Sequence, residues 1–363
     1  MKFYASIATA VAIAISGHAS ANTNTTIVNQ NGVGNTATSN QNDPTATGNL
    51  AVFTQFGDNN SSTTAQVNNS QNNTINSTQI GDNNTVSSID QDSSTTSNVT
   101  VIQNGQSNLF NALQMGATTS TSVTTQTGSN NQYTTVQLNS NIDSAVINQN
   151  GDLNTGSIAQ SSSSSSAVSI TQLGTSNTSG GAQSSETAST AIIFQDGTSN
   201  TASFGQGLGT GNTLSSTQLG TNNISQVVQF TASSDTAELL QDGDQNNANL
   251  SQEISLNSSI DVSQNGSLNV VTTFQSGSTN DGEIDQEGVS NLAELSQDGD
   301  QLTALMDQTG STNMASITQT STVNDAMTMQ MGTTNMHDTT QGSTGNTANA
   351  FQLGTSNVGT ILQ

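Results

Sequence analysis

Cysteine and tryptophan are absent from this 363-residue sequence, proline occurs once, and Lys2 is the only lysine or arginine. The absence of cysteine excludes a disulfide scaffold, a thiolate zinc site and a thiol nucleophile. The absence of a basic surface excludes nucleic-acid binding through phosphate neutralisation. Hydrophobic residues make up 30% and aromatic residues 3%, whereas a typical globular domain is about half apolar. We therefore expect no enzyme with a thick apolar core, and we assign no catalytic, cofactor-binding or metal-binding residue.

Residues 1–21 have the features of a secretory signal peptide. Lys2 supplies the positive start, residues 7–15 form an apolar run too short to span a bilayer, and Ala19-Ser20-Ala21 is a suitable cleavage site. A buried N-terminal helix is the alternative interpretation. We expect a secreted, extracellular chain from Asn22 onward that does not span the membrane. Cleavage would leave 25 acidic residues and no lysine or arginine.

What the sequence does contain is a repeat. The string Gln-x-Gly-x-x-Asn recurs in one phase fifteen times, at intervals of 22 to 25 residues. A second Gln follows eleven residues after the first in fourteen repeats; the third repeat has Asp90 there and Gln91 next to it. An unphased, disordered polar tract would not keep such spacing. The first Gln residues are Gln30, Gln55, Gln79, Gln103, Gln126, Gln149, Gln172, Gln195, Gln218, Gln241, Gln264, Gln286, Gln308, Gln330 and Gln352.

Each repeat predicts two strands separated by a tight turn. Apolar residues alternate with polar ones before the first Gln, which lies on the apolar face. Ile147, Ile170 and Ile193 mark this inward column best. In the Gly-x-x-Asn segment we expect Gly to supply a positive φ and Asn to tolerate one. Other large inward residues are Phe53, Phe110, Tyr133 and Phe204.

The two strands of a single repeat cannot bury their apolar face alone, but repeats stacked on one another can. We predict an all-β fold, a β-solenoid of about fifteen stacked strand-turn-strand units over residues 22–363, with two facing parallel sheets of amyloid-like cross-β kind. Equivalent amides would then form hydrogen-bonded ladders through the polar core. The expected ladder and turn residues include Gln30, Gly32, Asn35, Gln41, Gln149, Gly151, Asn154, Gln160, Gln172, Gly174, Asn177, Gln183, Gln195, Gly197, Asn200, Gln206, Gln352, Gly354, Asn357 and Gln363.

The pattern resembles the curlin repeat of bacterial curli fibres, Ser-x5-Gln-x-Gly-x-Gly-Asn-x-Ala-x3-Gln. Residues 30–41 match its Gln-to-Gln part at every fixed position. Four further repeats keep its Ala, at Ala202, Ala248, Ala293 and Ala315. The resemblance implies a secreted subunit of functional amyloid for cell adhesion and biofilm matrix. It also implies that the chain polymerises with further copies of itself, and that its other partners are a curli-type nucleator, chaperones and an outer-membrane export pore. Unlike well-known curlins, the chain has fifteen repeats and only residues 22–29 before the first repeat Gln.

The repeats begin close to Asn22 and the last one ends on Gln363, so we expect uncapped ends that assemble head to tail. Glu238, Asp261 and Glu283 should form an outward acidic column. We expect like-charge repulsion there, and again between Asp58 and Asp82 in adjacent turns. Gatekeeping against premature assembly and a divalent-cation site between units both remain open as roles for these carboxylates. Either role predicts faster assembly at acid pH.

Two other interpretations depend on single positions. His337 falls at an inward position and is expected to be a substituted core residue, since no second histidine is available to it for chemistry. The alternative function is that of a stable monomeric solenoid, either an adhesin or an ice-binding protein with threonine ladders. Threonines directly before the first Gln of a repeat favour the ice-binding function, but repeats without threonine there separate most of these residues. The threonines at this outward position are Thr54, Thr78, Thr125, Thr171 and Thr217.

Overall fold

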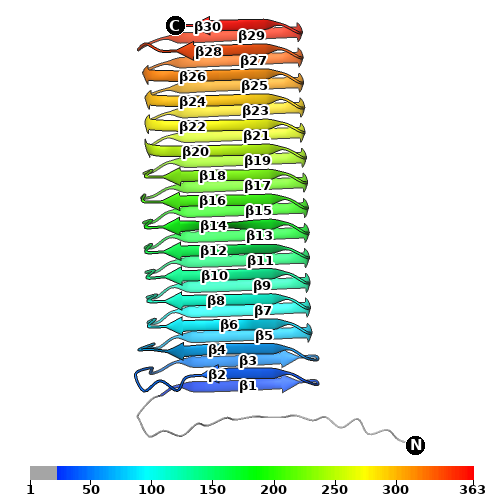
Figure 1. The fold of residues 1–363 in the computed structure, drawn as a ribbon, viewed down its shortest axis with the longest axis vertical. Coiled ribbons are helices and arrows are strands. Elements are labelled where there is room, and N and C mark those ends of the chain that lie inside the picture. The colour runs from blue at the N-terminus through cyan, green and yellow to red at the C-terminus, as the bar shows by residue number, and fades with distance from the viewer. Residues whose placement is uncertain (1–22) are drawn as a thin grey trace, which may run out of the picture. The chain divides into compact units, whose positions relative to one another are not determined.

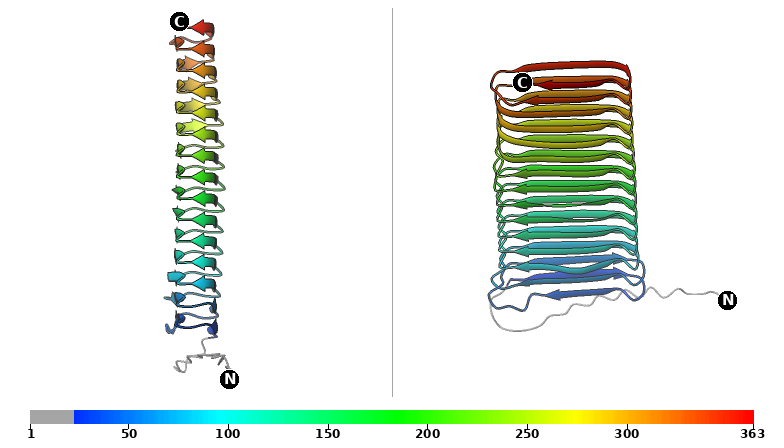
Figure 2. Two further views of the ribbon diagram at one scale, coloured as in Figure 1. Left: turned by 90° about the vertical axis from the view of Figure 1, so that its right-hand side faces the viewer. Right: turned by 45° about the horizontal axis from the view of Figure 1, so that its top comes forward.

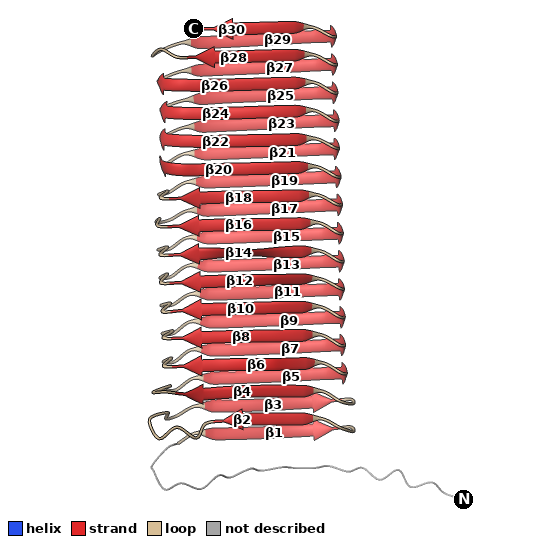
Figure 3. Cartoon of the chain, in the orientation of Figure 1, coloured by secondary structure: helices blue, strands red, loops and turns tan. Residues whose placement is uncertain are grey.

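The computed structural model describes residues 23–363, so the expected signal peptide lies outside the described residues. The chain divides into two compact units, the N-terminal unit up to Thr175 and the C-terminal unit from Ser176 to Gln363. Each is described by itself. Both consist of short strands joined by turns, and the described residues contain no helix (Figure 3).

The N-terminal unit contains thirteen strands. They are β1 (Thr25–Asn31), β2 (Thr36–Asn40), β3 (Leu50–Phe56), β4 (Ser61–Val67), β5 (Thr74–Asp82), β6 (Thr85–Asp92), β7 (Asn98–Gln106), β8 (Leu109–Met115), β9 (Thr121–Ser129), β10 (Gln132–Leu138), β11 (Ser144–Asp152), β12 (Thr155–Ser161) and β13 (Ala167–Thr175).

The C-terminal unit contains seventeen strands. They are β14 (Thr178–Ser184), β15 (Thr190–Thr198), β16 (Thr201–Gly207), β17 (Thr213–Thr221), β18 (Ile224–Phe230), β19 (Thr236–Asp244), β20 (Asn247–Leu256), β21 (Ser259–Ser267), β22 (Val270–Ser278), β23 (Asp281–Val289), β24 (Leu292–Asp300), β25 (Thr303–Ser311), β26 (Met314–Thr322), β27 (Asp325–Thr333), β28 (Met336–Gln341), β29 (Thr347–Thr355) and β30 (Val358–Leu362).

Within each unit the odd-numbered strands form one parallel sheet, the odd sheet, and the even-numbered strands form a second, the even sheet (Figure 1). An odd strand, a first turn, the next even strand and a second turn make one rung. Figure 2 shows the two sheets as separate layers in each unit. The predicted fold class is thereby confirmed: the chain is an all-β parallel solenoid of about fifteen rungs with two parallel sheets.

Register places equivalent residues over one another. Gln149 pairs with Gln172, and Ile147 pairs with Ile170, so the repeat period becomes a vertical column. Both isoleucines are buried, as the alternating pattern predicts. The core between the sheets is thin, and small polar groups meet across it. Ser62 of the even sheet, for example, donates to Ser77 of the odd sheet at 2.9 Å.

The shortening of the repeat from 23 to 22 residues has a structural cause in the second turn. In the longer repeats the second turn contains an additional residue, which forms an isolated β-bridge to the neighbouring rung; the last such bridge joins Ser233 and Leu256. In the next three second turns the backbone adopts the geometry of the first turn: Gly277 and Thr279, for example, have φ of 104° and 60°, close to 119° and 59° at Gly266 and Leu268. The last second turn differs, with a positive φ at Gly345 but not at Ser343. The segment 275–280 is accordingly a further Gln-x-Gly-x-x-Asn string, out of phase with the others, that our sequence analysis missed.

Candidate functional site

The most extensive polar feature of both units is a column of glutamine amides in each sheet. Gln149 is fully buried. Its Oε1 accepts from Gln126 Nε2 at 2.8 Å, and its own Nε2 donates to Gln172 Oε1 at 2.8 Å and to the Gln132 carbonyl at 3.2 Å. Every hydrogen-bonding atom of the amide is therefore used, which is the condition for burying it.

The odd-sheet ladder runs in one direction, because each Nε2 donates to the Gln one rung closer to the C-terminus. In the N-terminal unit it includes Gln30, Gln55, Gln79, Gln103, Gln126, Gln149 and Gln172. In the C-terminal unit it includes Gln195, Gln218, Gln241, Gln264, Gln286, Gln308, Gln330 and Gln352.

The even-sheet ladder has the same direction in both units. Its N-terminal members are Gln41, Gln66, Gln91, Gln114, Gln137 and Gln160. Its C-terminal members are Gln183, Gln206, Gln229, Gln252, Gln275, Gln297, Gln319, Gln341 and Gln363.

The irregular third repeat keeps the even-sheet ladder intact. A register shift between Ser62 and Thr64 on β4, opposite β6, brings Gln91 opposite Gln66 in place of Asp90. Gln66 Nε2 then donates to Gln91 Oε1 at 2.8 Å. The inserted residue is absorbed as a β-bulge, which is how a sheet accommodates one extra residue.

The first turn depends on Gly and Asn in different ways. Gly151 has a φ of 126°, and a Cβ there would lie 1.9 Å from the Gly174 carbonyl oxygen of the next rung. The same close approach recurs at Gly32 and Gly197. The last first-turn glycine, Gly354, has no such contact; its Cβ would lie 3.7 Å from its nearest neighbour, Asn357 Nδ2. Only glycine fits where backbone passes this near.

The expectation that the repeat Asn tolerates a positive φ is wrong. The second positive φ, 59°, belongs to Leu153, one residue before Asn154. Asn154 is instead buried and bonds to both neighbouring rungs: its N–H donates to Asn131 Oδ1, and its Nδ2 donates to the Gly174 carbonyl, both at 3.0 Å. Its side chain thus satisfies the backbone groups that the turn leaves unpaired.

The other expected Asn residues repeat these contacts within their own units. Asn35 Nδ2 donates to the Gly57 carbonyl at 2.7 Å, and Asn177 Nδ2 donates to the Gly197 carbonyl at 3.1 Å. Asn200 follows the same pattern, since its N–H donates to Asn177 Oδ1 at 3.0 Å. Asn357, in the last rung, donates to Asn335 Oδ1 at 2.9 Å.

The turn aspartates differ from the expectation of simple repulsion. Asp58 Oδ1 accepts from the Val33 N–H at 2.7 Å, and the Asp58 N–H donates to Asp82 Oδ1 at 2.8 Å. Each carboxylate therefore joins its rung to the preceding one. Asp152 does the same for Ser129 at 2.8 Å. Because hydrogen bonds to a charged acceptor are the stronger kind, they offset the repulsion between neighbours.

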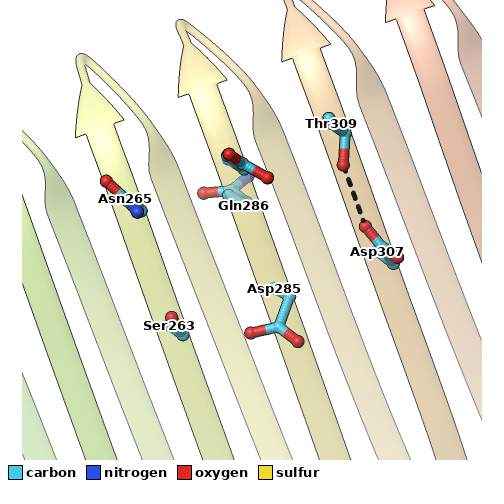
Figure 4. A pocket seen from close by; sticks show the side chains of 7 residues that line it. Ser263, Asn265, Asp285, Gln286, Asp307 and Thr309 are labelled. Carbon is cyan, nitrogen blue, oxygen red and sulfur yellow. Dashed lines mark hydrogen bonds between the residues drawn. The ribbon is translucent and has the colours of Figure 1, made fainter.

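The outward acidic column lies where the sequence placed it. Glu238 pairs with Asp261, and Asp261 pairs with Glu283, on β19, β21 and β23 of the odd sheet. Burial raises the pKa of Asp261, and the charge of Glu238 adds to the rise. Beside this column Asp285 and Asp307 line a shallow acidic depression (Figure 4). Within residues 23–363 no group of three or more histidine or acidic side chains is arranged to hold a metal ion.

His337 lies in the core of the even sheet, on β28. Its side chain is 3% exposed, Nε2 lies 2.8 Å from Thr339 Oγ1, and Nδ1 has no hydrogen-bond partner. A Cβ on Gly359, one rung further on, would come within 2.7 Å of Nδ1, so glycine leaves room for the ring. Burial lowers the pKa of His337, against a smaller opposing effect of Asp338.

We expect acid to loosen the rungs around His337. Since folding lowers its pKa below 6.5, the unfolded chain binds the proton more readily; the stability is fully present above pH 6.5 and decreases as the pH falls through the folded value. Amide hydrogen exchange of β28 and β30 should accelerate, relative to His337→Ala at the same pH, as the pH falls towards about 5. Equal exchange in both chains at every pH would contradict this.

No helix in the described part of the chain is both long and apolar enough to cross a membrane. Comparison with protein families matches the curlin associated repeat at residues 187–220 and 289–320, both within the C-terminal unit. The first segment includes β15 and β16, and the second includes β24 and β25. The chain thus carries curlin repeats, in agreement with the resemblance found in the sequence. No curated protein matched the chain.

Proposed function

We propose that this chain is a structural subunit of extracellular, curli-like amyloid fibres that assemble head to tail and serve cell adhesion and biofilm matrix. The curlin repeats and the parallel solenoid support a structural rather than an enzymatic role. Secretion, a curli-type nucleator, chaperones and an outer-membrane export pore belong to the same proposal.

The observation that carries the proposal is the direction of the glutamine ladders. Gln352 accepts from Gln330 and gives one amide hydrogen to the Met336 carbonyl, which leaves one hydrogen unused among the described residues. At the opposite end Gln30 donates to Gln55, and its Oε1 accepts nothing within the same residues. The free Gln352 amide hydrogen of one copy can therefore be donated to Gln30 Oε1 of a second copy, which continues the ladder in register.

The backbone edges offer the same complementarity. Within residues 23–363, β29 pairs only with β27 and β30 only with β28. N–H groups alternate between the two sides of a parallel strand. Because the Gln363 N–H faces β28, donating to Thr340 O at 3.0 Å, the Leu362 and Thr360 N–H groups face outward. Unpaired edges of this kind recruit further strands.

On β29 the Asn346 carbonyl accepts from the Asp325 N–H of β27 at 2.9 Å, so by the same alternation the Asn349 N–H faces outward. The test uses proline, which removes an outward N–H without breaking an existing bond. Chain lacking residues 1–21 should form fibres with reflections at about 4.8 Å and 10 Å and should seed its own growth. The double variant Asn349→Pro, Thr360→Pro should seed poorly, whereas Asn349→Ala, Thr360→Ala should seed normally. Both side chains are exposed, so neither change touches the core.

Two outcomes would count against the proposal in different ways. A parent chain that stays monomeric at high concentration would contradict self-assembly and favour the monomeric adhesin or ice-binding alternative, which a thermal-hysteresis measurement separates. Normal seeding by the proline variant would leave fibre formation standing but contradict growth through these edges.

A further inference from the structure

Three carboxyl groups are buried in the second turns of the solenoid, away from the outward acidic column. Asp143 is 1% exposed, and Glu186 and Asp235 are 0% exposed. Because Lys2 is the only lysine or arginine, none of the three has a basic partner among the described residues. A buried carboxylate without a cation is costly, and such a group normally takes up a proton instead.

The surroundings of Asp143 are entirely neutral. Its Oδ2 accepts from Ser163 Oγ at 2.5 Å and its Oδ1 from the Ser166 N–H at 2.9 Å, both on the following rung. On the preceding rung its N–H donates to Ser120 Oγ at 3.3 Å. Gln137, on the adjoining strand β10, donates to its carbonyl. No titratable side chain faces it from these segments.

Asp235 occupies the same position in the C-terminal unit and has equivalent partners. Its carboxylate accepts from the Ser255 hydroxyl and, at 2.8 Å, from the Ser258 N–H. Its own N–H donates to Asn212 Oδ1 at 3.2 Å on the preceding rung. The acidic residues on the two strands of its rung, Glu238, Asp242, Asp244 and Glu253, are exposed.

Glu186 lies three residues earlier in its second turn than Asp143 and Asp235 do in theirs, nine residues before Gln195, and is also held by neutral donors. Ser189 Oγ donates to it at 2.6 Å, the Gly209 N–H at 2.9 Å and Asn212 Nδ2 at 3.4 Å. Asn212 therefore contacts both Glu186 and Asp235. All three carboxyls accept hydrogen bonds from a serine hydroxyl and a backbone N–H, and Glu186 also accepts one from an amide.

Other rungs show what a neutral side chain does at the position of Asp143 and Asp235. Asn73 and Asn212 stand there, six residues before the first Gln of their rungs. Their Nδ2 groups donate to the Ser94 carbonyl at 2.8 Å and the Ala232 carbonyl at 2.9 Å. A donor is therefore accommodated at this position, and a protonated carboxyl has the Ser163 or Ser255 hydroxyl oxygen within reach as an acceptor.

We propose that Asp143, Glu186 and Asp235 form an acid-responsive device, in which protons taken up from solvent by these buried carboxyls stabilise the second turns. Acid surroundings then favour the folded solenoid, and near-neutral surroundings keep these turns weaker. The device acts on folding itself and does not depend on the proposed fibre function.

The sign of the effect follows from burial. Desolvation raises the pKa of Asp143 and of Asp235 above 3.8, with hydrogen bonds opposing part of the rise and no charged neighbour contributing. Desolvation likewise raises the pKa of Glu186 above 4.5. A raised pKa in the folded state means stability that is fully present below the unfolded value and is lost as the pH rises through the folded one.

The experiment compares the full chain with Asp143→Asn, Asp235→Asn, using guanidinium unfolding followed by circular dichroism from about pH 4 to about pH 7. The matched control is Asp196→Asn, Asp242→Asn, which removes the same charge from two exposed positions. The buried pair should raise the unfolding midpoint at pH 7 and flatten its dependence on pH. The exposed pair should leave both nearly unchanged. His337 is present in every chain, so its opposite effect cancels.

Infrared spectroscopy gives a second readout: the parent should show a protonated-carboxyl band at mildly acid pH that the buried pair reduces. If the asparagine pair does not fold, Asp143→Ser, Asp235→Ser replaces it, because Ser120 and Ser166 occupy the same column. A buried pair that lowers the midpoint equally at both pH values, or retains the parent's pH dependence, would overturn the proposal.

Discussion

Replacing Gln149 by alanine should lower the free energy of unfolding by about 4 kcal/mol or more. The change takes the acceptor from Gln126 Nε2 and the donor from Gln172 Oε1, both 2.8 Å away. An unmade hydrogen bond at a buried group costs about 1–3 kcal/mol. Truncation of a large buried side chain adds a cavity term of similar size. Two such groups and a cavity exceed the effect of an ordinary core mutation.

Guanidinium unfolding of Gln149→Ala against Asn148→Ala measures this cost. Asn148 is the neighbouring residue on the same strand, but its side chain is exposed. Its truncation should change stability by no more than about 0.5 kcal/mol. If the two variants unfold at the same guanidinium concentration, the amide ladder is not what holds the rungs together.

Replacing Gly151 by alanine should be about as damaging, at roughly 3 kcal/mol or more, for a backbone reason. Its φ of 126° lies in a region that costs an L-residue about 1–3 kcal/mol. The added Cβ would also lie 1.9 Å from the Gly174 carbonyl oxygen, so the two turns must move apart. That separation weakens the Asn154 bond to the same carbonyl.

Gly205→Ala is the matched control for the glycine prediction. Gly205 has no positive φ, and a Cβ there would meet only Val228 Cγ2, at 4.0 Å. The same chemical change should therefore be tolerated, or slightly stabilising, since alanine restricts the unfolded chain more than glycine does. Comparable unfolding midpoints for Gly151→Ala and Gly205→Ala would show that the close approach of the first turns is not a constraint.

Much of this fold can be predicted because the repeat itself encodes register. Once Gln149 and Gln172 occupy equivalent places in successive repeats, stacking puts one over the other, and a slip of one residue would expose the inward side chains. The alternation around Ile147 and Ile170 then gives the inward face. Little tertiary information is needed beyond the period.

The features that the sequence did not reveal depend on local backbone choices. Both Leu153 and Asn154 fit a turn, and only the backbone contacts decide that the first takes the positive φ. Gln91 replaces Asp90 in the ladder because a bulge shifts the register by one residue. The charge of Asp143 suggests a surface residue, yet the serine and asparagine residues at the equivalent position of other repeats are buried, as Asp143 is. Comparing residues down each column would have found it.

The shared direction of the glutamine amides has an electrical consequence. In a β-sheet the dipoles of neighbouring backbone groups largely cancel. The side-chain amides do not cancel, since in each unit all the Gln-to-Gln bonds run from Nε2 to the Oε1 one rung closer to the C-terminus. Their moments add along the stack, so an assembly built from such units in series would have unlike poles, and its two tips would elongate at different rates.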